Sequence, residues 1–233
     1  NCISYDPAFA FELAVIIQDG LRRMFVEQED VYYYITVMNE NYTHPAMPDK
    51  SEEGILRGMY LLRKGGKKKQ KVQLLGSGTI LREVIAAAEL LESDFGVTSD
   101  VFSVTSFNEL RREGMDIGRW NLLHPDKKAK ICYVTSLLQG SDCPVIAATD
   151  YMKVYADQIR EFVPNRYVVL GTDGFGRSDT RKQLRKFFEV NRHYIAVAAL
   201  KALADEGNIP VTKVKEAIKK YDIDPEKPDP TTV

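Results

Sequence analysis

The stretch VQLLGSGTILREVIAAAELLESDF, residues 72–95, decides the fold class. A short apolar run at 72–75 leads through the turn Gly76-Ser77-Gly78 into a segment whose apolar residues recur at helical spacing. A strand, a tight turn and an amphipathic helix form the repeating unit of an α/β fold. We expect Ser77 or Thr79 to cap the helix. The apolar residues of that helix are Ile80, Leu81, Val84, Ala87, Ala88 and Leu91.

The same unit recurs toward the C-terminus. We predict strands at 101–104, 145–148 and 167–170, and helices at 107–114, 152–162, 181–188, 194–204 and 211–221. Strands that alternate with helices favour a mostly parallel sheet with helices on both faces, a three-layer α/β/α sandwich. The segment 222–233 has three prolines and few apolar residues, which predicts a flexible tail.

The first 38 residues do not make a domain by themselves. Asp6-Pro7 is typical of a helix N-cap followed by proline at the first helical position. An apolar stretch follows, made of Phe9, Phe11, Leu13, Ala14, Val15, Ile16 and Ile17. The aromatic run 31–38 predicts a strand. One helix and one strand cannot enclose a core. We therefore expect 1–38 to be the end of an incomplete domain whose body lies upstream of Asn1.

The division along the chain follows from these segments. A polar segment with two prolines, 39–51, is the expected linker, and 52–221 is the main α/β domain, in which a short helix near 51–57 leads to the segment 59–63. Each boundary falls where the apolar pattern stops and turn-forming residues begin.

Composition limits the possible functions. The 233 residues are 44% apolar and 28% charged, with a formal net charge of −1, as in a soluble globular protein. This balance gives no electrostatic reason to expect nucleic acid or an anionic membrane as partner. No apolar run approaches the roughly 20 residues of a membrane-spanning helix. Three cysteines without metal-binding spacing fit a reducing, cytoplasmic compartment.

The turn Gly76-Ser77-Gly78 raises the alternative of a nucleotide-binding oxidoreductase domain. A dinucleotide fingerprint needs a third glycine at position 81, which is Leu81. The next strand ends in Thr105 and Ser106, whereas the fingerprint needs a ribose-binding acid there. A tight strand-to-helix turn is the favoured interpretation.

The loop GTDGFGRSDTR, residues 171–181, is a candidate anion site. The backbone amides of Gly174 and Gly176 could hold an anion together with the guanidinium groups of Arg177 and Arg181. The alternative is a glycine-rich connection in which Ser178 or Asp179 begins a helix and the arginines pair with acids or face water. The three histidines lack zinc-site spacing, and no complete catalytic constellation is present.

Several segments, taken together, resemble the C-terminal end of the homodimeric bacterial pyruvate dehydrogenase decarboxylase component, a thiamine-diphosphate-dependent member of the transketolase-like superfamily. The similarity runs in order along nearly the whole chain. The segments are NCISYDPAFA (1–10), YYYITVMNENY (32–42), PAMP (45–48), QLLGSG (73–78), DVFSVTSF (100–107), RWNLLHP (119–125), TDYMK (149–153) and GTDGFGRSD (171–179).

The resemblance implies a fold and a reaction. Residues 1–38 would be the last helix and strand of a pyrimidine-binding domain, and 52–221 a transketolase-type C-terminal domain. The intact subunit would decarboxylate pyruvate on thiamine diphosphate, with magnesium, and reductively acetylate the lipoyl group of the dihydrolipoyl acyltransferase component. A second copy of the subunit would be its partner in a homodimer in the bacterial cytoplasm.

The resemblance also limits which residues can carry a role. The catalytic, cofactor-binding and metal-binding groups of the family would lie upstream of Asn1, so none is expected here and the isolated chain should be inactive. In phospho-sugar transketolases an arginine that clamps the substrate phosphate stands where this chain has Asn39. Asn39 and Glu40 are therefore substrate-channel candidates, with a purely structural turn as the alternative. The chain itself would serve assembly and channel shaping, or act as a non-catalytic partner-docking module.

Overall fold

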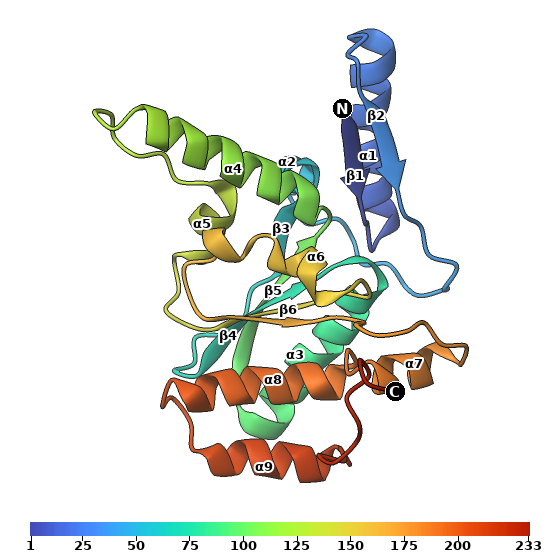
Figure 1. The fold of residues 1–233 in the computed structure, drawn as a ribbon, viewed down its shortest axis with the longest axis vertical. Helices are drawn as coiled ribbons and strands as arrows, with labels where there is room; N and C mark the ends of the chain where they lie inside the picture. The colour runs from blue at the N-terminus through green and yellow to red at the C-terminus, as the bar shows by residue number, and fades with distance from the viewer.

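The computed structural model describes residues 1–233 (Figure 1). Its strands are β1 Cys2–Tyr5, β2 Tyr32–Ile35, β3 Met59–Arg63, β4 Lys71–Gly76, β5 Thr98–Val104, β6 Val145–Ala148 and β7 Tyr167–Leu170. Its α-helices are α1 Ala10–Leu21, α2 Glu52–Arg57, α3 Leu81–Phe95, α4 Phe107–Leu123, α5 Tyr133–Leu138, α6 Lys153–Asp157, α7 Arg181–Phe187, α8 Arg192–Asp205 and α9 Val211–Lys220. Shorter helical turns are Arg22–Val26, Gly78–Ile80 and Arg160–Phe162.

Five strands form the main sheet in the order β3-β5-β4-β6-β7. β4, β5, β6 and β7 are parallel, and β3 pairs with β5 in the antiparallel direction at one edge. The register places Leu74 of β4 beside Val101 on one side and Ile146 on the other. The predicted mostly parallel α/β sheet is confirmed.

Helices cover both faces of this sheet, as Figure 1 shows. Successive residues of β4 point to opposite faces, because side chains alternate along a strand. Leu74 packs in a core with residues of α3, α8 and α9, whereas Leu75 packs in a second core with residues of α4, α5 and α6. Both leucines are completely buried. Two filled cores, one on each face, give the three layers predicted from the sequence.

The N-terminal unit stands to one side of the sheet (Figure 1). β1 and β2 form a separate parallel pair, with α1 between them in the chain. Their small core combines Ile3, Tyr5 and Ile16 with Ile55 and Tyr60 from the neighbouring α2 and β3. The unit therefore shares its core with the main domain.

The carboxyl group of Glu12 also joins the two parts. Its side chain is completely buried. It accepts hydrogen bonds from the Tyr60 hydroxyl at 2.7 Å and the Ser103 hydroxyl at 2.6 Å, and from the backbone amides of Ala8 and Phe9. A buried polar group is stable only when it is hydrogen-bonded in this way.

The predicted cap at Asp6 is wrong, since α1 begins at Ala10 and Phe9 is the N-cap residue. The Asp6 carboxylate instead accepts hydrogen bonds from Thr36 at 2.7 Å, Tyr151 at 3.0 Å and Tyr155 at 2.6 Å. Of the two predicted caps, Ser77 is the N-cap residue of the turn Gly78–Ile80 that leads into α3, but its side chain makes no capping hydrogen bond. Thr79 lies inside that turn and is not a cap. Tertiary partners outweighed local capping at Asp6 and at Thr79, which bonds to Glu40 and Arg185.

Helix α4 is longer than predicted and ends at Leu123. Gly114, the predicted end, lies inside the helix, where a Cβ atom would come within 2.6 Å of the Phe162 ring. The glycine therefore permits close packing and does not end the helix. The predicted helix 152–162 is divided into α6 and the turn Arg160–Phe162, while the short elements β1 and α5 were not predicted.

Candidate functional site

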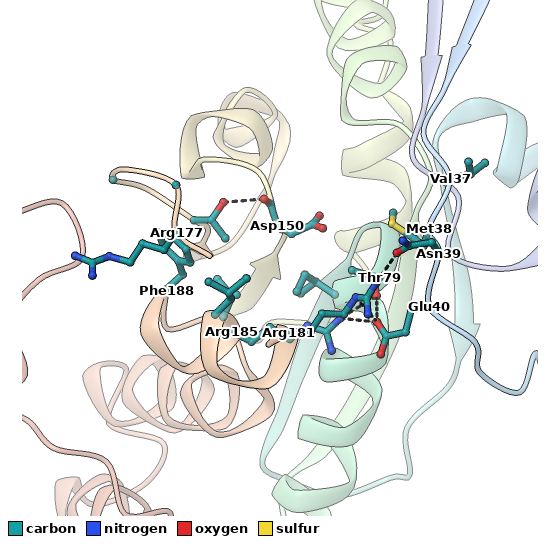
Figure 2. A pocket seen from close by; sticks show the side chains of 16 residues that line it. Val37, Met38, Asn39, Glu40, Thr79, Asp150, Arg177, Arg181, Arg185 and Phe188 are labelled. Atoms are coloured by element: carbon teal, nitrogen blue, oxygen red, sulfur yellow. Dashed lines mark hydrogen bonds and ion pairs between the residues drawn. The ribbon is translucent and has the colours of Figure 1, made fainter. Parts of the chain in front are cut away.

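A cavity of about 580 Å³ lies between the main sheet, the linker and α7 (Figure 2). Its walls include residues that follow the carboxyl ends of β4, β6 and β7: Thr79, Asp150 and Thr172. From β4 the chain places β5 on one side and β6 on the other, so the strand order reverses beside β4. Ligands of parallel α/β sheets bind outside the carboxyl ends at such a reversal. The cavity is therefore the candidate site.

All five side chains or loop positions proposed from the sequence lie around this cavity. Asn39 and Glu40 enter from the linker, and Gly174, Gly176 and Arg177 belong to the loop on the opposite side. The structure brings together two groups of candidates that are more than a hundred residues apart in the chain. The remaining apolar walls come from Val37, Met38, Ile80, Leu184, Phe188 and Val190.

Glu40 is the centre of an ion-pair network that fixes the linker. Its carboxylate accepts hydrogen bonds from Arg82 at 2.6 Å, Arg185 at 2.8 Å and the Thr79 hydroxyl at 3.1 Å. Burial opposes ionisation, but the hydrogen bond and charge of Arg185 outweigh it, and the pKa of Glu40 is lowered. Both oxygens of its carboxylate accept hydrogen bonds from these donors, so Glu40 connects the linker to α3 and α7.

Asn39 is hydrogen-bonded by Arg181, the first residue of α7. The Arg181 guanidinium donates to the Asn39 amide oxygen, and Arg181 Nε lies 3.7 Å from Glu40 (Figure 2). Asn39 is thus oriented by a residue that α7 places one turn before Arg185. The neutral amide stands at the cavity wall beside cationic side chains.

Glu83, a second carboxylate, extends the network to α8. Arg192 donates to it from its backbone amide and from Nε, both at 2.9 Å, and Arg185 Nη1 lies at 3.4 Å. Burial opposes ionisation, yet the hydrogen bonds from Arg192 and the charges of Arg192 and Arg185 hold the pKa of Glu83 below its usual value. Arg185 is the link between the two carboxylates.

The glycine loop has its own packing constraints. Gly174 has φ +110°, and a Cβ there would collide with the carbonyl oxygen of Pro230. The Arg177 guanidinium lies 4.3 Å from the centroid of the Phe187 ring, and Figure 2 shows it directed away from the linker. The N-cap of α7 is Thr180, so the predicted start at Ser178 or Asp179 is wrong by one or two residues.

The tail packs behind this loop. The Lys227 ammonium donates to the Phe187 carbonyl at 2.8 Å and to Glu189 at 3.0 Å. Pro230 is buried. These contacts connect the end of the chain to the segment that follows α7.

The turn at Gly76-Ser77-Gly78 faces the linker. Gly78 has φ +51°, and a Cβ atom there would lie 2.8 Å from the methyl carbon of Met38. At Gly76 a Cβ atom would lie 2.7 Å from Leu81 Cα. The space above the turn, where a dinucleotide would place its pyrophosphate, is taken by the linker methionine. This geometry favours the tight-turn interpretation over the nucleotide-binding alternative.

Asp150 is a cavity residue that sequence reasoning missed. It lies two residues after the end of β6 and forms no ion pair, and Figure 2 shows its carboxyl group toward the interior of the site. Burial raises the pKa of Asp150, and the nearby charge of Asp6 raises it further. Its position after a buried strand next to the strand-order reversal is the signal that could have identified it.

The histidines have structural partners. Nδ1 of His44 accepts the backbone amide of Ala10 at 2.8 Å, at the start of α1. His124 stacks on Trp120 and His193 stacks on Tyr221, with ring centroids 4.4 Å and 4.7 Å apart. No group of three or more histidine, cysteine, aspartate or glutamate side chains is arranged to hold a metal ion.

No helix has the length and apolar character needed to cross a membrane. The charged network occupies the surface between α3, α7 and α8.

Comparison with known proteins places the chain in a family. Residues 58–191 match the transketolase-like TK C-terminal domain, and residues 1–45 match the pyruvate dehydrogenase E1 component middle domain. The chain belongs to the transketolase-like C-terminal domain family. A transketolase from Pichia stipitis has the same fold, with a TM-score of 0.60 at 18% identity over 89% of this chain and 26% of its own.

Relatives with higher sequence identity define the family of this chain more narrowly. The chain is 63% identical to the pyruvate dehydrogenase E1 component of Cupriavidus necator over 100% of its own length, and 62% identical to that of Pseudomonas aeruginosa over 99%. The resemblance to the pyruvate dehydrogenase decarboxylase component is confirmed. The chain spans 26% of the length of these curated relatives.

Proposed function

We propose that this chain is the C-terminal part of a thiamine-diphosphate-dependent pyruvate dehydrogenase subunit. The observation that carries the proposal is 63% identity, over the whole chain, to a pyruvate dehydrogenase E1 component. The intact subunit decarboxylates pyruvate and reductively acetylates the lipoyl group of the dihydrolipoyl acyltransferase. Thiamine diphosphate supplies the carbanion chemistry when it is bound.

The part described by this structure serves assembly and channel shaping. Residues 1–38 complete a pyrimidine-binding domain, and 52–221 form the C-terminal domain. Catalytic groups, cofactor and magnesium belong to the rest of the subunit. The linker carboxylate supports this division, because Glu40 lines the cavity but is bound by Arg82 and Arg185.

Asn39 forms part of the channel mouth, and Glu40 is a positioning residue. An arginine clamp suits a phosphate because its planar fork donates two parallel hydrogen bonds. Pyruvate has no phosphate, so a neutral amide at position 39 suits a small 2-oxo acid. The hydrogen bond from Arg181 to Asn39, and those that tether Glu40, support a fixed linker corner.

A second copy of the subunit and the acyltransferase are the proposed partners, in the bacterial cytoplasm. The N-terminal unit supports burial against further protein, because large apolar side chains are exposed on it. They are Ile17, Leu21, Phe25, Val26, Tyr32 and Tyr34. Large apolar side chains that are exposed in number on one small unit are typical of contact sites.

The test is a calorimetric titration of thiamine diphosphate with magnesium into the 233-residue chain, followed by an assay of pyruvate decarboxylation. We expect no saturable heat and no turnover from the chain alone. Saturable cofactor binding or turnover of pyruvate would show that a cofactor site lies on this chain. It would overturn the proposal that the catalytic groups lie on the rest of the subunit.

A further inference from the structure

A second hollow of about 520 Å³ lies beside the candidate site, between α3, α7 and the start of α8. No apolar side chain lines it. Two carboxylates, those of Glu40 and Glu83, face five cationic side chains. The cations are Arg82, Arg181, Lys182, Arg185 and Arg192.

Both carboxylates already form ion pairs within the protein. Glu40 is bound by Arg82 and Arg185, and Glu83 by Arg192 and Arg185. These pairs hold the linker and two helices to α3, so the three arginines have a structural role.

The other two cations are not explained by that role. Lys182 forms no ion pair and is exposed. Arg181 donates to the neutral amide of Asn39, and its closest carboxylate oxygen, on Glu40, is 3.7 Å away. Helix α7 itself contains no acidic residue. The hollow therefore presents an excess of positive charge and unused hydrogen-bond donors.

We propose that this hollow binds a small phosphate-bearing anion. Guanidinium groups match phosphate oxygens bidentately, and a lysine adds a mobile point charge. A multiply charged anion is favoured over a single carboxylate, because five cations converge on only two carboxylates. Arg181 and Arg185 line both this hollow and the candidate site, so the bound anion competes with Glu40 for the same donors.

The test is a calorimetric titration of inorganic pyrophosphate into the 233-residue chain, with ionic strength kept constant by chloride. We expect saturable binding with a dissociation constant of about 1 mM or below. Lys182→Gln should weaken binding about fivefold, the effect of one exposed charge pair. Glu40→Gln should strengthen binding, because it removes the carboxylate that competes for Arg185.

Lys215→Gln is the matched control. It removes the same charge from an exposed position on α9, away from the hollow, and should change the affinity less than about twofold. Equal effects of Lys182→Gln and Lys215→Gln would overturn the location of the site. Absence of saturation at about 10 mM pyrophosphate would overturn the site itself. The assay contains neither pyruvate nor thiamine diphosphate, so either failure leaves the proposed function standing.

Discussion

The N-terminal unit and the main sheet domain differ in how completely they bury their apolar side chains. In the sheet domain Leu74 and Leu75 point to opposite faces and are both completely buried under helices. In the N-terminal unit Phe25 is 81% exposed and Val26 71% exposed. A parallel strand pair is normally covered on both faces. The sheet domain therefore builds its two cores mainly from its own strands and helices, with Ala8 and Phe9 added from the N-terminal unit, whereas the N-terminal unit takes part of its small core from α2 and β3.

Glu12→Ala should give the largest effect, because it breaks the main polar link between the two regions. The change leaves the hydroxyls of Tyr60 and Ser103 and two backbone amides without their acceptor. We expect a loss of about 3 to 5 kcal/mol in the free energy of unfolding. Denaturant unfolding measures it.

Glu216→Ala on the exposed face of α9 is the control and should change the free energy of unfolding by less than about 0.5 kcal/mol. If Glu12→Ala were as mild as this control, the two regions would not depend on the buried carboxyl group.

Glu83 should make the stability of the sheet domain depend on pH. Its pKa is lowered below the ordinary value of 4.5, so its ionised form stabilises the folded state. This stability is fully present above about pH 4.5 and is lost as the pH falls through the lowered pKa. Glu83→Gln should therefore cost about 1 to 2 kcal/mol at pH 6 and much less at acid pH.

Urea unfolding of wild type and Glu83→Gln at a series of pH values tests the sign. Glu92→Gln, whose side chain is exposed on the same helix, is the control. A penalty that stays constant from pH 6 to strongly acid pH would exclude a contribution from the ionisation of Glu83.

Lys227→Ala, near the C-terminus, should have the smallest effect of these substitutions. It removes the hydrogen bonds to the Phe187 carbonyl and Glu189. We expect a change below about 1 kcal/mol in global stability, with faster amide hydrogen exchange in the tail and the loop 172–180. Lys213→Ala on α9 is the control. Unchanged exchange in both segments would mean that the tail does not restrain the loop.

The sheet was predictable because its signals are local. The strands at 145–148 and 167–170 are short apolar runs, and the long helix at 81–95 keeps its apolar spacing over several turns. The ends of elements were less predictable. A glycine such as Gly114 is common at helix ends. Here it lies inside α4 and leaves space for the Phe162 ring, which comes from a distant segment of the chain.

The site was only partly predictable. Asn39 and Glu40 could be selected through the family resemblance, but nothing near residue 40 in the sequence identifies Arg82 and Arg185 as its partners. Asp6 shows the same limit, since its partners Tyr151 and Tyr155 lie about 145 residues away and outweigh the local cap. Interactions between distant segments have no local pattern that a single sequence displays.

The Glu40 tether also sets an order in time during synthesis. Arg185 follows Glu40 by 145 residues. At about 5 to 20 residues per second, a ribosome needs roughly 7 to 30 seconds to add that length. The linker corner is therefore made well before α7 and gains its Arg185 contact only after α7 has left the ribosome, so the mouth of the cavity is among the last parts of the nascent protein to close.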